Sequence, residues 1–105
     1  MSRAAAILLN EQGNVEQISV DTSPRSPFTH DALGGTPTIQ GAWNGVVLLG
    51  RAEPSEGARD VDETLLRPDQ RESGPLKVPL LLTRADGADI LDFTTEDYEE
   101  WLAGN

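Results

Sequence analysis

The chain has 105 residues, the length of one domain, and it contains no cysteine. The missing thiols exclude a disulfide scaffold, thiolate zinc sites, iron–sulfur clusters and a cysteine nucleophile. Eighteen acidic residues against eight basic ones give a formal net charge of −10, which argues against direct binding to nucleic acid or to an anionic membrane. Leu, Ile, Val and Phe together exceed the roughly 20% below which such a charge indicates disorder. We therefore expect one soluble globular α+β domain over residues 1–105.

The first elements predicted are two strands that form a hairpin. Residues 4–9 are a continuous run of small apolar side chains, and residues 15–20 place apolar side chains at roughly alternate positions. Between them, Gly13 and Asn14 tolerate the positive φ that a tight turn requires. The apolar run is too short for a signal peptide, and no run approaches the length of a membrane span. The sequence thus predicts a cytoplasmic or equivalent interior location, without membrane insertion.

A short helix and a second hairpin follow. Residues 27–33 predict one or two helical turns, which Gly34 and Gly35 end. The strands 36–43 and 46–51 flank an Asn-Gly dipeptide, which favours the type I′ turn of a two-residue hairpin. Four consecutive apolar residues from Val46 predict a strand that is buried on both faces. Pro37 indicates that the preceding strand begins at a sheet edge.

The middle of the chain predicts a long irregular acidic loop at about 52–75, broken by prolines and glycines. A strand over 76–84 comes next. Because Pro79 cannot donate to a strand ladder, we expect an edge strand or a bulge there. A turn and a short return strand over 89–93 follow.

A C-terminal helix completes the fold. Thr94 is positioned to cap it together with Asp97, and Phe93 and Tyr98 occupy the two positions of a hydrophobic staple. Tyr98 and Trp101 belong to one apolar stripe. The predicted class is α+β, a small and mostly antiparallel sheet of four to six strands with one C-terminal helix.

The sequence offers no constellation of residues for catalysis. His30 is the single histidine, and its neighbour Asp31 cannot easily orient the imidazole because consecutive side chains diverge. The acidic residues lack the spacing of a calcium loop, and the glycines lack the pattern of a phosphate cradle. We therefore predict no catalytic residue, no metal and no cofactor.

The acidic charge is concentrated near the end of the chain, where residues 86–105 contain seven acids and no base. An acidic surface of this kind favours a basic protein partner, because opposite fields steer association. Tryptophan is enriched both in cores and at interfaces. The predicted partner contacts lie beside the second hairpin's turn, in the long loop and on the C-terminal helix; they are Trp43, Asn44, Asp60, Asp62, Glu63, Glu96, Glu99, Glu100 and Trp101.

Two stretches of the chain carry a family resemblance. One runs from Gly34-Gly35-Thr36 through residues 39–43 to 46–51, and the other joins residues 78–84 to the Asp-Phe-Thr and Asp-Tyr-Glu-Glu-Trp-Leu motifs at 92–94 and 97–102. Together they resemble a family of small uncharacterised proteins of algae and large algal DNA viruses. The resemblance implies the strand–strand–helix order and no reaction, cofactor or catalytic residue.

The leading functional hypothesis is a non-enzymatic protein–protein interaction module, such as an accessory subunit of a larger assembly. One alternative is an acidic mimic that occupies the nucleic-acid groove of a basic protein. Another is a small-substrate enzyme that uses His30 or a pair of acids.

Overall fold

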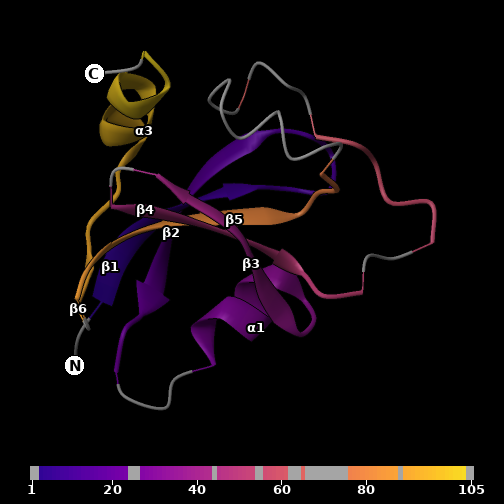
Figure 1. The fold of residues 1–105 in the computed structure, drawn as a ribbon, viewed down its shortest axis with the longest axis horizontal. Helices are drawn as coiled ribbons and strands as arrows, with labels where there is room; N and C mark the ends of the chain where they lie inside the picture. The colour runs from indigo at the N-terminus through magenta and orange to yellow at the C-terminus, as the bar shows by residue number, and fades with distance from the viewer. Residues whose placement is uncertain are drawn as a thin grey trace.

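The computed structural model shows an antiparallel sheet with helices packed on it (Figure 1). It describes residues 3–23, 27–43, 45–53, 56–61, 65, 76–87 and 89–103. The elements in chain order are β1 (Arg3–Leu9), β2 (Val15–Asp21), α1 (Phe28–Leu33), β3 (Pro37–Trp43), β4 (Val46–Arg51), β5 (Leu80–Asp86), β6 (Asp89–Leu91) and α3 (Thr95–Leu102). The fold is therefore of the α+β class, as the sequence predicts.

The strand order of the sheet is β2-β1-β5-β4-β3, and β6 also pairs with β5. The two hairpins β1–β2 and β3–β4 form as predicted, and β5 joins them by pairing with β1 on one side and β4 on the other. After β6 the chain crosses onto β1, where the Phe93 N–H donates to the Ala5 carbonyl at 2.9 Å. The Asp92 carboxylate accepts the Ala5 N–H at 2.8 Å, which fastens this crossing.

One face of the sheet carries the larger part of the core. Alternate side chains of β1, β4 and β5 point to this face, as the period of two in a strand requires. They pack against Phe93 and against α3, which contributes Tyr98 and Trp101. The buried residues of this cluster are Ile7, Leu9, Val46, Leu48, Val78, Leu80, Leu82, Phe93, Tyr98 and Trp101.

The opposite face of the sheet packs against α1 and is built from smaller side chains. Its buried residues are Ala6, Val20, Leu33 and Leu81, and the half-buried Leu49 packs against them. The strand β4 is thus fully buried on one face and half-buried on the other, which refines the expectation of burial on both faces. Helices on two faces explain why the central strands are apolar at consecutive positions.

The entry of α3 matches its sequence signals. The Thr94 hydroxyl accepts the Asp97 N–H at 3.2 Å, while the Asp97 carboxylate accepts the Thr94 N–H at 3.1 Å. This reciprocal capping box satisfies two donors that a helix start leaves unpaired. The Phe93 and Tyr98 rings meet edge to face with centroids 6.3 Å apart, so the predicted staple also forms.

The expectation of an edge strand or bulge at Pro79 is wrong. The strand β5 begins at Leu80, directly after the proline, and it is the central strand of the sheet. The missing N–H of Pro79 therefore falls outside the ladder and disturbs no strand pairing. Before Pro79, Lys77 forms an isolated bridge with Asp60 in place of the predicted continuous strand.

The described parts of the long middle segment are tied to the rest of the protein. The Val61 N–H donates to the Leu76 carbonyl at 2.8 Å, and the Val78 N–H donates to the Arg59 carbonyl at 3.0 Å. The Tyr98 hydroxyl of α3 donates to the Leu65 carbonyl at 2.6 Å. The last of these bonds places Leu65 beside α3. No helix in the described part of the chain is long and apolar enough to cross a membrane.

Candidate functional site

The outer surface of α3 carries three of the predicted contact residues. Glu96, Glu99 and Glu100 are all exposed, because the helical period turns Tyr98 and Trp101 toward the sheet and these carboxylates toward solvent. Within the described ranges, none of the three glutamates forms an ion pair. We call Glu96, Glu99 and Glu100 the acidic face of α3.

Trp101, also predicted as a contact, is a core residue in the structure. Its side chain is 3% exposed and stacks on Tyr98 with ring centroids 6.1 Å apart. It also meets Phe93 edge to face at 6.2 Å. A partner cannot reach this ring in the folded protein, so the prediction of Trp101 as a contact is wrong. Its packing instead fixes α3 on the sheet.

The remaining predicted contacts are spread over other parts of the chain. Trp43 is the last residue of β3, opposite Val46 of β4. Asp60 is exposed, but its carboxylate forms an ion pair with the ammonium of Lys77. Three further candidates lie outside the described residues: Asn44, Asp62 and Glu63.

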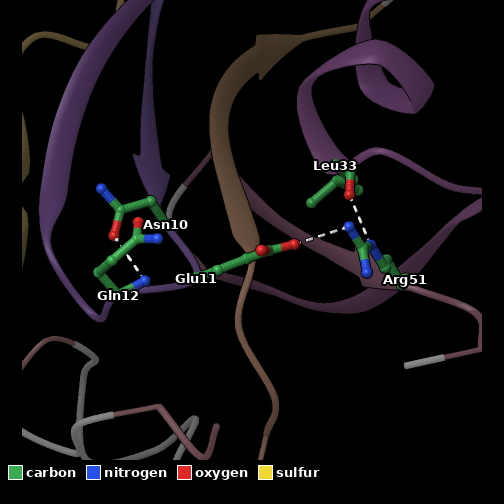
Figure 2. A network of polar contacts seen from close by, with 5 residues as sticks. All are labelled: Asn10, Glu11, Gln12, Leu33 and Arg51. Carbon is green, nitrogen blue, oxygen red and sulfur yellow. Dashed lines mark hydrogen bonds and ion pairs between the residues drawn. The ribbon is translucent and has the colours of Figure 1, made fainter. Parts of the chain in front are cut away.

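A polar network that the sequence analysis missed is centred on Arg51, at the end of β4 (Figure 2). Its Nε donates to the Leu33 carbonyl at the end of α1 at 2.6 Å, and its Nη2 lies 3.0 Å from a Glu11 carboxylate oxygen. The Arg51 side chain is 17% exposed. A single guanidinium thus connects β4, α1 and the β1–β2 turn.

The two glycines after α1 make room for this guanidinium. Gly34 has φ +71°, a conformation in which a side chain would be strained, and a Cβ there would lie 2.9 Å from Arg51 Nη2. A Cβ on Gly35 would also touch the Arg51 side chain, at 3.6 Å. The sequence predicts only a helix stop at the Gly-Gly pair, and the structure adds close packing to that role. The sequence signal that could have found it is a lone basic residue in an otherwise uncharged hairpin.

The β1–β2 turn presents Glu11 to Arg51. The Asn10 side-chain oxygen accepts the N–H groups of Gln12 and Asn14, both at 3.0 Å. This Asx-type arrangement fixes the turn in the way that asparagine side chains commonly do. Figure 2 shows the Glu11 carboxylate extending from the turn toward Arg51.

Beside this network lies a polar hollow of about 390 Å³. Two arginines, Arg51 and Arg59, and two glutamates, Glu11 and Glu56, contribute to its lining. The Arg59 guanidinium donates to the Gln12 carbonyl at 2.9 Å. Among the described lining residues, the two positive and two negative charges balance, and they offer both hydrogen-bond donors and acceptors.

The described part of the chain offers little for reactive chemistry. No group of three or more His, Asp or Glu residues within it is placed to hold a metal ion. His30 is exposed on α1.

Two carboxyl groups have lowered pKa values. The Asp97 carboxylate accepts hydrogen bonds from Thr94, above all from its main-chain N–H, and these bonds lower the pKa of Asp97. Hydrogen bonds from Ser23 likewise lower the pKa of Asp21. Both shifts come from local capping and turn contacts.

These features define a small α+β domain with an exposed acidic helix face and an arginine-centred structural network. The chain belongs to a family of unknown function, DUF5880, whose family model matches residues 7–101. No curated protein and no solved structure matches the chain. The predicted resemblance to proteins of algae and algal viruses stays a prediction.

Proposed function

We propose that this protein is a non-enzymatic interaction module that recognises a basic surface of another protein through the acidic face of α3. The observation that carries the proposal is the exposure of Glu96, Glu99 and Glu100 without an ion-pair partner among the described residues. Three like charges on neighbouring turns repel one another. A cationic partner surface relieves that repulsion.

The helix is well prepared for this role because its other side is fixed. Its inner surface buries Tyr98 and Trp101 in the core, and its first turn is closed by the capping box. A binding surface that is rigid before association loses less conformational entropy on binding. The acidic field also steers a basic partner toward it and raises the association rate at low salt.

The experiment compares two doubly neutralised variants in affinity capture from native extract, with mass spectrometry to identify the partner. Glu99→Gln/Glu100→Gln removes two charges from the acidic face, and Glu53→Gln/Glu56→Gln removes two exposed charges elsewhere. The first variant should lose the partner that the wild type retains, and the second should keep it. Both should unfold within about 0.5 kcal/mol of the wild type, since exposed substitutions rarely do more.

Washing at low and high salt separates the subunit hypothesis from the mimic. A stoichiometric partner that survives high salt favours an accessory subunit with a partly apolar interface. Nucleic-acid-binding proteins that are lost at high salt favour the acidic mimic, because screening removes interactions between exposed charges. Equal loss of the partner from both double variants would refute the assignment to α3.

A further inference from the structure

The two outer strands of the sheet differ in charge. The strand β2 contains Glu16 and Asp21, and charged side chains are a common device for keeping an exposed edge from pairing with another chain. The strand β3 contains no charged residue, and its neighbour β4 contains only Arg51. Among the described residues, β3 pairs with β4 alone. The β3 edge therefore lacks the charge protection that β2 has.

The main chain of β3 offers hydrogen-bonding groups to this free side. The Ala52 N–H donates to the Thr36 carbonyl at 2.8 Å, just beyond the paired residues Pro37 and Arg51. Because bonded and non-bonded pairs alternate in an antiparallel ladder, the N–H and carbonyl of Ile39 point away from β4. The N of Pro37 also points away from β4, so the missing N–H of the proline removes no hydrogen bond between β3 and β4.

The side chain at the same position is apolar and accessible. Ile39 is 69% exposed, more than any other large hydrophobic residue that the structure describes, and Leu91 follows at 42%. Ile39 lies directly opposite Leu49, which is half-buried against the α1 face. An added strand would cover Ile39 and extend this partly buried surface, in the manner of strand addition at other sheet edges.

Two features limit the length of the edge that can pair. Pro37 has no N–H to donate, and the ladder shifts register between Ile39 and Gly41. At this bulge the Gln40 side chain lies against Gly50, where a Cβ would be 3.2 Å from it. A contact over so few residues falls in the class of small interfaces, which are weak.

The distribution of charge favours a second copy of the chain as the partner that pairs with the free edge of β3. The start of α3 lies beside β2, at the other edge of the sheet from β3, because Thr95 donates its N–H to the Gln17 side chain of β2 at 2.9 Å. Figure 1 shows α3 on the side of the sheet opposite to α1, and α1 is the helix that contacts β3. Joining two copies at β3 brings uncharged edges together, whereas a basic segment would be drawn to the carboxylates of α3.

We propose that this protein self-associates into a two-fold dimer by antiparallel pairing of β3 with β3 of a second copy, centred near Ile39. A two-fold contact uses the same patch on both copies, which an uncharged strand satisfies without like-charge pairs. This surface is separate from the acidic face of α3, so the failure of one proposal leaves the other standing.

Sedimentation equilibrium over about 10 μM to 1 mM protein tests the proposal, a range that suits a weak interface. The wild type should shift from monomer to dimer with concentration, and added salt should strengthen the dimer by screening the repulsion between two chains of charge −10. Ile39→Lys should weaken dimerisation at least tenfold. Leu91→Lys, at the other exposed hydrophobic residue, should leave it unchanged.

Hydrogen exchange gives a second readout that needs no substitution. The Ile39 amide should exchange more slowly as the protein concentration rises, because dimerisation gives it a bonding partner. A monomer at every concentration and salt would overturn the proposal, and so would equal effects of the two lysine variants. Capture of an extended segment from a different protein at this edge, with no dimer, would also overturn it.

Discussion

The two faces of the sheet secure their helices by different means. The helix α3 has eight residues and its own capping box, and its Tyr98 and Trp101 rings pack against each other and against Phe93. The helix α1 has six residues, its N-cap Pro27 makes no side-chain capping bond, and it buries only Leu33 completely. In place of a large apolar face, α1 has its last carbonyl bound by Arg51.

The difference shows how a helix too short to be stable alone can still be fixed in a fold. Isolated helices below about 12 residues are marginal in water, so both helices depend on tertiary contacts. Apolar burial and local capping supply those contacts for α3. For α1 the apolar contacts are smaller, and one polar side chain on another element adds a hydrogen bond to its last carbonyl. Four measurements test this contrast, in order of decreasing expected effect.

Phe93→Ala should cause the largest loss, about 3–5 kcal/mol in the free energy of unfolding measured by chemical denaturation. Phe93 is fully buried and contacts both other aromatic rings of the α3 face, so the substitution leaves a cavity at the centre of the cluster. Phe93→Leu should lose much less, because it keeps most of the volume. A loss below about 1 kcal/mol for the alanine variant would contradict the aromatic account of this face.

Arg51→Met should destabilise by about 1–3 kcal/mol, because it leaves the buried end of α1 without its donor. Methionine keeps much of the aliphatic stem, so the loss reports mainly on the guanidinium. Glu11→Gln is the matched control. The Glu11 side chain is 60% exposed, and its ion pair should contribute less than about 1 kcal/mol. If Glu11→Gln costs as much as Arg51→Met, the ion pair rather than the helix carbonyl is the main contact.

Thr94→Ala should lower the unfolding free energy by about 1 kcal/mol, the usual effect of removing an N-cap hydroxyl. Thr94→Ser retains the oxygen that accepts the Asp97 N–H and should stay close to the wild type. Thermal unfolding followed by circular dichroism measures both. Equal losses from the two variants would show that the threonine methyl, and not the cap, matters.

The smallest expected effect is the dependence of the unfolding free energy on acidic pH. Because the pKa of Asp97 is lower in the folded protein than its ordinary value of 3.8, its carboxylate adds stability that is fully present above that value. This stability is lost as the pH falls through the lower folded pKa. Unfolding of the wild type and Asp97→Asn, measured between pH 6 and pH 2, should show curves that converge at the acid end. Curves that stay parallel throughout would contradict this linkage.

The parts of the structure that the sequence predicted are those set by near neighbours. The two hairpins, the α3 cap and the Phe93–Tyr98 staple each depend on residues a few positions apart, where turn and capping preferences act. The apolar stripe that predicted α3 contains Trp101, which was nevertheless predicted as a partner contact and which the structure buries in the core. Local chemistry thus identified α3 and the surface it exposes.

The parts that could not be predicted depend on long-range pairing. Nothing local shows that β5 lies at the centre of the sheet, because its neighbours β1 and β4 come from distant parts of the chain. The Arg51 network was missed for the same reason, since Leu33 and Glu11 are 18 and 40 residues away in sequence. Partners so remote leave no periodic signal in the sequence.

The central position of β5 has a consequence for biosynthesis. The chain emerges from the ribosome with its two hairpins made first, and each hairpin has one strand, β1 or β4, that waits for the same later strand. Until Leu80 and its successors appear, both hairpins expose apolar strands with unpaired main-chain groups. Translation that stops before β5 should therefore yield fragments prone to aggregation, and completion of this one strand converts two separate hairpins into a single sheet.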